Sequence, residues 1–223
     1  MTTIAVLPVK RLSDAKQRLG GRLSPGTRRL LAESMATDVL IALRRAIRVD
    51  ATVVVTSEAA IAAIARGHGA ETIADPPEPG HNPAARKGVA HAVARGASRV
   101  LLVPGDCPAL VPAEVDGLLA PPVARNGEVV VVPDRHGTGT NALVLAPPDA
   151  IEPSFGPGSR ERHERAARTA GVACRIAEPF SLALDVDTAD DLDTLRAAFA
   201  QGVGGAAHTR GALMRLGERW ALH

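Results

Sequence analysis

Three aspartates stand at the ends of apolar runs, and their type and spacing could hold a metal ion. Asp106 ends the run VLLVPGD, and Asp185 and Asp187 end the run LALDVD. Carboxylates at the carboxyl edge of a parallel sheet lie where α/β proteins bind their ligands. Carboxylate oxygens are also the hard donors that Mg²⁺ prefers. The three residues therefore predict metal-assisted chemistry on phosphates.

Two of the three aspartates also have a structural explanation. Asp106 lies in a Pro-Gly-Asp turn, and Asp187 directly precedes a helix cap at Thr188. Asp185 has no such alternative. Residues two apart on an extended strand share a face, so Asp185 and Asp187 would repel each other unless a cation neutralises them. This spacing is the strongest indication of a metal ion.

A basic loop follows the first apolar run. It carries Lys10, Arg11, Lys16, Arg18 and Arg22. Such a loop could hold a polyphosphate by charge, although a solvated basic loop is the structural alternative. The patterns GxxxxGK[ST] and GxGxxG are absent, which excludes a Walker A loop and a dinucleotide-binding fingerprint.

Two glycine-rich segments offer groups for a small anion. RHGTGTNAL carries the hydroxyls of Thr138 and Thr140, and SFGPGSRERH brings Gly156, Gly158 and Ser159 to the start of a helix. Backbone N–H groups at a helix start, together with a serine hydroxyl, bind anions. The structural alternative is a flexible loop that ends in Ser159 as a helix cap.

The remaining histidines and cysteines form no catalytic pattern. His136 and His163 lack the spacing of zinc ligands and are interpreted as surface residues. Cys107 has no histidine and asparagine arranged beside it and is interpreted as a small buried thiol. Cys174 lies far from Cys107 and forms no CxxC motif, which is typical of a protein from a reducing compartment.

Composition excludes several classes of function. The 223 residues are 46% hydrophobic but only 2% aromatic, with no Tyr, so aliphatic side chains must fill the core and base-stacking platforms are not expected. The net charge of +2, from 26 basic and 24 acidic residues, argues against nucleic-acid binding. No long apolar run or signal-peptide pattern is present, so we expect no membrane partner and a cytoplasmic location.

Apolar runs alternate with helical patterns in the first half of the chain. Strands are expected at 3–8, 51–56, 71–74 and 99–103, and helices at 25–47, near 57–67, at 84–95 and from 112 onward. This rhythm indicates a mostly parallel sheet with crossover helices. Strands at 128–133 and 141–145, joined by DRHGTGT, predict a small antiparallel insertion.

The last third of the chain is expected to add two short strands and two helices. The strands are placed at 172–176 and 181–184, and the helices begin at Ser159 and after the cap Thr188. We therefore predict an α/β fold with one domain over residues 1–200, a mostly parallel mixed sheet flanked by helices. Residues 201–223 would form a partly helical C-terminal tail.

Together the motifs resemble a known superfamily. PVKRLSDAKQRL, GHNPAARKG, VPGDCP, GTGTNALVL, FGPGSRERH and LDVDTADDL follow in order over nearly all of residues 3–200. The first loop, PGDCP and the DxDTxxDL ending resemble nucleotidyltransferases, whose Rossmann-like fold is that of nucleotide-diphospho-sugar transferases. GTNAL with FGxxSxxxH more narrowly resembles the guanylyltransferases of coenzyme F-420 biosynthesis, which use phosphoenolpyruvate or 2-phospho-L-lactate.

The resemblance implies a role for each motif. It implies Mg²⁺ at the three aspartates and a phosphorylated three-carbon acid at Thr140, Gly156 and Ser159. Lys10 and Lys16 would bind GTP and, with Arg18, stabilise the leaving pyrophosphate; Gly80 and Asn82 would contact the base or ribose. The expected partners are GTP and the acid, with hand-over of a labile product to the next transferase, in a monomer or homodimer.

Several alternatives stay open on sequence alone. Phosphoenolpyruvate, 2-phospholactate and 3-phosphoglycerate differ by features that depend on pocket shape. A different nucleotidyltransferase, of cytidylyl or molybdopterin type, is the second enzyme hypothesis. A non-catalytic nucleotide-binding regulator is the third, and it predicts GTP binding without turnover.

Overall fold

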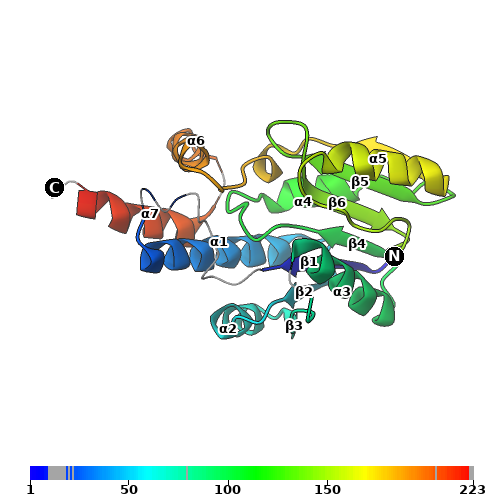
Figure 1. The fold of residues 1–223 in the computed structure, drawn as a ribbon, viewed down its shortest axis with the longest axis horizontal. Helices are drawn as coiled ribbons and strands as arrows, with labels where there is room; N and C mark the ends of the chain where they lie inside the picture. Colours follow the sequence, from blue (N-terminus) through cyan, green and yellow to red (C-terminus); the bar gives the residue numbers. More distant parts are fainter. Residues whose placement is uncertain (10–18, 20, 22, 79, 204, 221–223) are drawn as a thin grey trace.

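A central sheet of seven strands organises the structure, a computed structural model (Figure 1). It describes the chain except residues 10–18, 20, 22, 79, 204 and 221–223. The strand order is β3-β2-β1-β4-β6-β5-β7. The strands are β1 Thr3–Pro8, β2 Ala51–Val55, β3 Glu71–Ile73, β4 Arg99–Leu102, β5 Glu128–Pro133, β6 Thr140–Ala146 and β7 Ala173–Ile176.

One strand runs against the others. β6 is antiparallel to both of its neighbours, β4 and β5, whereas all other neighbouring pairs are parallel. The prediction of a mostly parallel sheet with a small antiparallel insertion is therefore confirmed. Because β6 is reversed, its first residue lies at the same edge of the sheet as the carboxyl ends of β1, β4 and β5.

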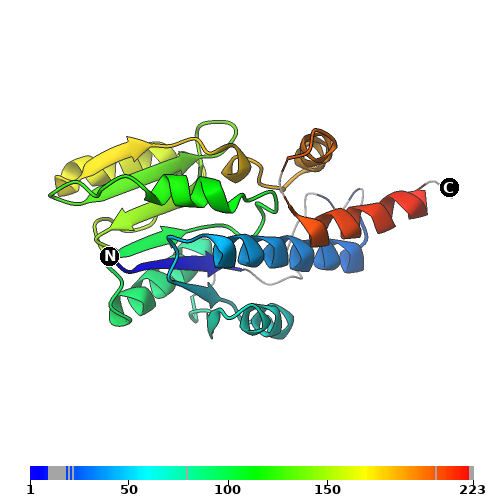
Figure 2. The same ribbon diagram turned by 180° about the vertical axis from the view of Figure 1, so that it is seen from behind.

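Helices cover both faces of the sheet. They are α1 Pro25–Arg45, α2 Ala59–Gly67, α3 His81–Ala94, α4 Pro112–Leu119, α5 Ser159–Ala170, α6 Ala189–Ala200 and α7 Ala207–Trp220. One apolar core forms between the sheet and α1, α2 and α4, and a second forms between the sheet and α3 and α5. Figure 1 shows α3 and α5 in front of the sheet, and Figure 2 shows α1 and α4 on the opposite side.

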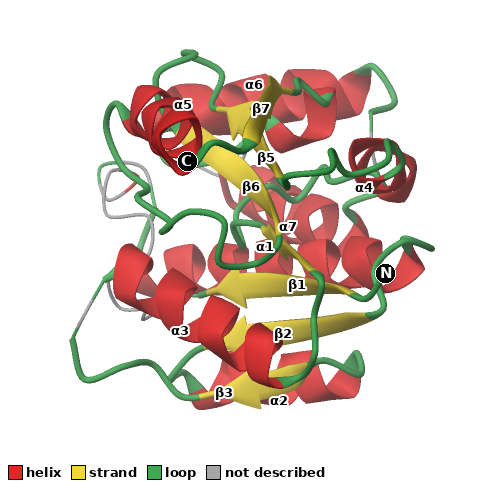
Figure 3. Ribbon diagram, turned by 90° about the vertical axis from the view of Figure 1, so that its right-hand side faces the viewer, coloured by secondary structure: helices red, strands yellow, loops and turns green. Residues whose placement is uncertain are grey.

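The strands are apolar on both sides, as a sheet covered on both faces requires. All six residues of β1 are buried. Helix α3 approaches β1 closely because Gly88 has no side chain: a Cβ there would overlap the side chain of Val6. Figure 3 shows the two helical layers on either side of the strands.

A third apolar cluster lies beyond the end of the sheet, where α6 and α7 pack on the first half of α1. It includes Leu31 and Met35 of α1, Leu195 of α6 and Leu213 of α7. Asp38 of α1 is buried and accepts hydrogen bonds from the first backbone N–H groups of α7. Helix α7 is thus attached to α1 by apolar and polar contacts. No helix in the described part of the chain is both long and apolar enough to cross a membrane.

Three local expectations were wrong. Residues 181–184 do not form a strand, because Phe180–Leu182 is a short 3₁₀ helix, η2. Helix α3 begins three residues earlier than expected, at His81, so Asn82 lies in its first turn. Ser159 is not a cap: Gly158 occupies that position with φ +69°, and Ser159 is the first helical residue, with its side chain turned into the core.

Candidate functional site

The carboxyl edge of the sheet brings the predicted metal segments together. Asp106 follows β4 in the PGDCP turn, and the segment after η2 passes beside it. The backbone N–H of Val186 donates to the carbonyl oxygen of Asp106, at 3.1 Å. Val186 itself is fully buried, so the neighbouring residues Asp185 and Asp187 flank an anchored position. Two segments eighty residues apart in sequence are joined at this point.

Asp185 is partly buried beside other carboxylates. Burial, and then the charge of Asp106, raise its pKa from 3.8 to about 6, with a smaller contribution from Asp187. Asn141 opposes this shift, because its amide donates to Asp185 Oδ1 at 3.1 Å and to the carbonyl of Leu182 at 2.7 Å. Asn141 thereby fixes the carboxylate beside two like charges.

The side chain of Asp187 is exposed, and its position is restrained through hydrogen bonds of the backbone. Its N–H and that of Thr188 both donate to Asp191 Oδ2, at 3.0 and 2.6 Å. The Thr188 side chain in turn accepts from the Asp191 N–H, which confirms Thr188 as the cap of α6 in a capping box. Arg135, from the loop after β5, lies 2.7 Å from Asp191 Oδ1. Burial raises the pKa of Asp191, but these bonds and Arg135 outweigh it and lower that pKa overall.

The donor set at this edge is suitable for a hard cation. The residues offer carboxylate oxygens, and their mutual repulsion raises the pKa of Asp185. A divalent cation would remove that repulsion, and oxygen donors are those that Mg²⁺ prefers. As placed in the described part of the chain, no three acidic, His or Cys side chains are close enough to form a set of ligands. The carboxylates therefore share an electrostatic environment without being gathered around one point.

A second polar cluster lies at the start of β6. The hydroxyl of Ser159 donates to Thr140 Oγ1, and His163 Nδ1 lies within hydrogen-bond distance of the same oxygen, each at 3.1 Å. His163 Nε2 accepts from the backbone N–H of Ser154, at 2.9 Å. His163 is fully buried, so its interpretation as a surface residue was wrong. Two of the residues predicted to bind the acid, Thr140 and Ser159, are brought together here.

A β-bulge separates the two clusters. Val132 pairs with Ala142, and the next residue, Pro133, pairs with Thr140, which leaves Asn141 as an extra residue in β6. Val132 and Ala142 face α1 and α4. Since side chains alternate along a strand, Pro133 and Thr140 face the α5 side instead. The bulge thus directs Thr140 to α5, while the amide of Asn141 reaches the aspartate segment.

The loop before α5 is tied down from both sides. The amide of Asn82 accepts from the Phe155 N–H at 2.7 Å and donates to the Phe155 carbonyl at 3.1 Å. Arg162 donates to the hydroxyl and the carbonyl of Ser154, each at 3.0 Å. Gly156 follows with φ +111°, a conformation that L side chains rarely adopt. The loop is therefore held in one shape next to Thr140.

The other predicted site residues are placed differently. Lys10, Lys16 and Arg18 lie outside the described residues. Gly80 is exposed at the start of α3 with φ +139°. Asn82 has its amide engaged by Phe155, so it connects α3 to the loop before α5. Its assignment to guanine or ribose stays a prediction.

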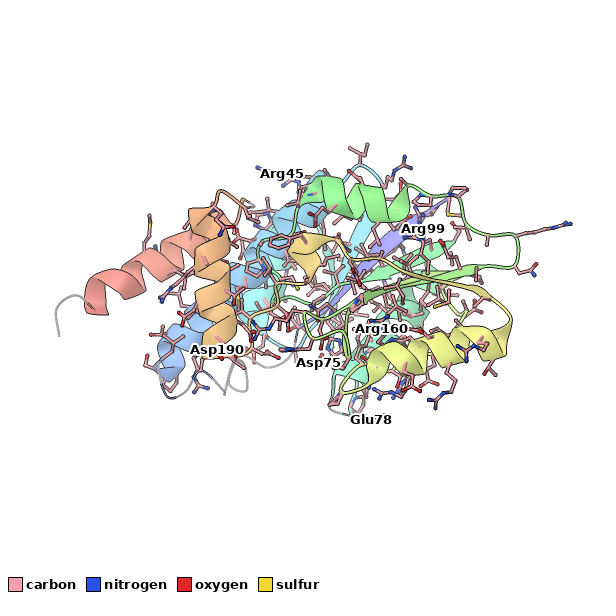
Figure 4. The ribbon with its side chains drawn as sticks, turned by 90° about the horizontal axis from the view of Figure 1, so that it is seen from above. Arg45, Asp75, Glu78, Arg99, Arg160 and Asp190 are labelled. Carbon is pink, nitrogen blue, oxygen red and sulfur yellow. The ribbon has the colours of Figure 1, made fainter. Side chains whose placement is uncertain are left out.

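The site lies at the carboxyl edge of the sheet, on the side of α6 (Figure 1). In Figure 4, Asp190 at the start of α6 and Arg99 at the start of β4 lie toward opposite ends, with Arg160 of α5 between them. Arg99 belongs to the amino ends of the strands and is bonded to Thr3 and to the Leu119 carbonyl there. The acidic segments and α6 thus gather at the opposite edge from this structural arginine.

Sequence reasoning missed Asn141, His163, Arg135 and Asp191. The signal for His163 was available: Ser159, His163 and Ala167 recur every four residues and form the buried stripe of α5. Asn141 and Arg135 act through partners on other elements, which no local pattern indicates. Asp191 had a local signal, because it stands three residues after the cap Thr188 in a capping box.

The chain is similar in sequence to known guanylyltransferases. A family model described as guanylyl transferase CofC like matches residues 3–214. The chain belongs to this family. A phosphoenolpyruvate guanylyltransferase of Conexibacter woesei is 53% identical over 216 residues, 97% of each chain. Another, of Sphaerobacter thermophilus, is 44% identical over 195 residues, 87% of this chain and 93% of that one.

Solved structures agree with the fold of the family. A Desulfovibrio desulfuricans G20 protein described as a nucleotide-diphospho-sugar transferase matches with a TM-score of 0.72 and 18% identity, covering 98% of both chains. A Methanothermobacter nucleotidyl transferase matches with a TM-score of 0.64 and 17% identity, covering 90% of this chain and 99% of that one. The expected nucleotide-diphospho-sugar transferase type of fold is confirmed.

Proposed function

We propose that this guanylyltransferase joins GTP and phosphoenolpyruvate to give enolpyruvoyl-2-diphospho-5'-guanosine and pyrophosphate, a step in coenzyme F-420 biosynthesis. The observation that carries the proposal is the 53% identity, over 97% of both chains, to a protein named for this activity. The site geometry supports it, because the adjacent residues Thr140 and Asn141 at the start of β6 contact Ser159 and Asp185 respectively.

The acid would bind on the hydroxyl side of the site. Thr140 presents a half-buried hydroxyl group beside the constrained loop at Gly156, and the buried hydroxyl of Ser159 holds it by donating to Thr140 Oγ1. Hydroxyl donors and the N–H groups at a helix start are the usual partners of phosphate and carboxylate oxygens. The acceptor phosphate would thereby be oriented toward the aspartate segments.

Mg²⁺ would be held by Asp106, Asp185 and Asp187. When bound there it would screen the repulsion between two anionic substrates. Asn141 orients Asp185, and Asp191 fixes the backbone of Asp187, so both carboxylates are presented by restrained segments. By family resemblance, the leaving pyrophosphate would be stabilised by Lys10, Lys16 and Arg18. The base or ribose of GTP would be contacted by Gly80 and Asn82.

The reaction is an in-line displacement that needs orientation more than proton transfer. An oxygen of the acceptor phosphate attacks the α-phosphorus of GTP, and the bond from that phosphorus to the β-phosphate oxygen breaks to release pyrophosphate. A phosphate nucleophile is already ionised near neutral pH, so no general base is required. His163 Nε2 is occupied by a backbone N–H, which is consistent with a site that uses no histidine base.

The decisive experiment is a matrix of four nucleoside triphosphates against three acids. Pyrophosphate release and product mass would be measured for GTP, ATP, CTP and UTP, each with phosphoenolpyruvate, 2-phospho-L-lactate and 3-phosphoglycerate. We expect GTP with phosphoenolpyruvate to be the best pair and chelation of Mg²⁺ to stop the reaction. A better rate with CTP, or pyrophosphate release that needs no phosphorylated acid, would contradict the proposal.

The proposed product carries a phosphoanhydride and an enol phosphate ester, both open to hydrolysis. Hand-over to the next transferase of the pathway is therefore part of the proposal, as are a cytoplasmic location and a monomeric or homodimeric state. Size-exclusion chromatography with light scattering, alone and with the next transferase, would measure both association states.

A further inference from the structure

His163 lies at the centre of the hydroxyl cluster, yet neither the motif analysis nor the chemistry of the reaction gives it a role. It is fully buried on α5, and both ring nitrogens have partners from other segments. Nε2 accepts from the Ser154 N–H at 2.9 Å, and Nδ1 lies 3.1 Å from Thr140 Oγ1. The Phe155 ring packs against the imidazole edge-on, with centroids 5.5 Å apart. The ring is thus fixed in orientation.

The protonation state of the ring follows from its partners. A backbone N–H can only donate, so Nε2 must be unprotonated to accept from Ser154. Burial, and then the charge of Arg162, lower the pKa of His163 from 6.5 to about 4, so the ring is neutral near pH 7. A neutral imidazole carries one proton, which must then be on Nδ1. That proton points at Thr140 Oγ1.

The Thr140 hydroxyl is consequently left with one possible direction of donation. A hydroxyl has two acceptor positions and one proton. The acceptor positions are filled by His163 Nδ1–H and by the Ser159 hydroxyl. No group in the described part of the chain accepts the Thr140 proton. Thr140 is only half-buried, so this proton is available to a bound ligand.

We infer that His163 is a positioning residue for the acceptor acid, which fixes the Thr140 hydroxyl as an obligatory donor to the bound anion. The inference rests on the proposed function. Phosphate and carboxylate oxygens only accept hydrogen bonds when ionised, so a fixed donor is complementary to them. A ligand group that must itself donate, such as a protonated acid or an alcohol, finds no acceptor on Thr140. The arrangement therefore selects a fully ionised acceptor.

Two substitutions separate the two ends of the imidazole. The side-chain amide of His163→Asn reaches the position of Nδ1 and can still donate to Thr140, but it leaves the Ser154 N–H unpaired. The amide of His163→Gln reaches the position of Nε2 and can still accept from Ser154, but it cannot donate to Thr140. The pair therefore distinguishes support of the loop from orientation of the hydroxyl.

We expect the Gln variant to raise KM for the acid roughly tenfold, because a hydrogen bond to a charged group is weakened. Its KM for GTP, its kcat and its melting temperature should stay near the wild-type values. The Asn variant should show the reverse: a lower melting temperature, with KM for the acid within about threefold of wild type. Equal rises in KM for the acid in both variants, or a fall in kcat and affinity for both substrates, would overturn the inference.

A spectroscopic measurement tests the inference without any turnover. Long-range ¹H–¹⁵N correlation of the histidine rings identifies the protonated nitrogen, and the His163 signals are assigned by their loss in His163→Gln. We expect a neutral ring with its proton on Nδ1 at pH 7. A proton on Nε2, or a charged ring, would overturn the inference. If wild type gave this tautomer but no guanylyl transfer, the proposed function alone would fail.

Discussion

Asn82 pairs its side-chain amide with both backbone polar groups of Phe155, seventy-three positions later in the chain. The side-chain amide thus makes the same pair of hydrogen bonds that a residue on a neighbouring β-strand would make. It attaches the first turn of α3 to the loop that precedes α5. One residue thus links the segment expected to serve the nucleotide to the segment expected to serve the acid.

Replacing Asn82 tests which of these roles dominates. Asn82→Ala removes two hydrogen bonds, each contributing about 1 kcal/mol, and should destabilise the protein by ~2 kcal/mol in chemical denaturation. Because the loop at Phe155 is released, KM for the acid should rise more than KM for GTP. Asn82→Asp is the matched control, since it keeps the acceptor for the Phe155 N–H. A selective rise in KM for GTP would instead favour direct contact with the nucleoside.

Neutralising Asp185 should separate stability from activity. In Asp185→Asn the side chain can still accept from Asn141, while its repulsion with Asp106 and Asp187 is removed. The melting temperature should therefore stay equal or rise. Guanylyl transfer should fall by roughly 100-fold or more, because stabilisation by a metal ion amounts to several kcal/mol. Asp193→Asn, at an exposed position on α6, is the control. Full activity of the Asp185 variant would remove this residue from the metal site.

The buried His163 should make the free energy of unfolding depend on pH. The pKa of His163 is lowered from 6.5 to about 4 in the folded protein, by burial first and Arg162 second. Between these values the unfolded chain binds a proton that the folded chain does not, so folding is weakened as pH falls from about 6.5 toward 4. The full shift in the pKa of His163 corresponds to a change of about 3 kcal/mol in the free energy of unfolding. The free energy of unfolding in denaturant would measure it.

The effect of His163 is measured by comparing the free energy of unfolding of wild type with that of His163→Asn. The raised pKa of Asp185 acts in the same range with the opposite sign: its contribution to stability is present at low pH and lost as pH rises through about 6. Wild type and His163→Asn share Asp185, so its effect cancels in their comparison. The stability advantage of wild type should shrink as pH falls from 6.5 to 4. An advantage that is constant with pH would show that the ring titrates normally.

Two helical glycines should respond in opposite ways to alanine. Gly88→Ala places a methyl group against Val6 and should destabilise the protein by ~1–3 kcal/mol through overpacking of α3 on β1. Gly117→Ala in α4 meets nothing within 4 Å and should stabilise by about 0.5–1 kcal/mol through helix propensity. Thermal denaturation of both variants measures the contrast. Equal effects would mean that α3 can move away from the sheet.

The attachment of α7 to α1 predicts a local effect of Asp38. Asp38→Ala leaves the N–H groups of His208 and Thr209 without their acceptor and should cost about 1–2 kcal/mol, as the loss of a helix cap does. Limited proteolysis should then cut between α6 and α7 faster than in wild type. Asp38→Asn retains an acceptor oxygen and serves as the control. An unchanged cleavage rate would indicate that apolar contacts alone hold α7.

The sequence predicted those features that depend on neighbouring residues. Buried parallel strands appear as continuous apolar runs, so most strands and the acidic strand ends could be located. The strand expected at 181–184 is replaced by the 3₁₀ helix Phe180–Leu182, because a segment of three or four residues is too short to show a helical or strand periodicity. The burial of His163 could be read from the repeat of Ser159, His163 and Ala167, but its partners, Thr140 and Ser154, come from other segments and could not. The bulge at Asn141 depends on the pairing of β5 with β6, which one strand alone does not reveal.

The bulge also makes the enzyme modular. The part of the site proposed to bind the acid is built from Thr140 and the continuous segment 153–163, whereas the part proposed to hold the metal is built from the turn after β4 and the segment 185–187. One extra residue, Asn141, keeps the two halves on separate supports. Exchange of residues 153–163 between relatives would therefore transfer acceptor preference while leaving the nucleotide chemistry in place. Acceptor specificity would then change without any change in the carboxylates proposed to hold the metal.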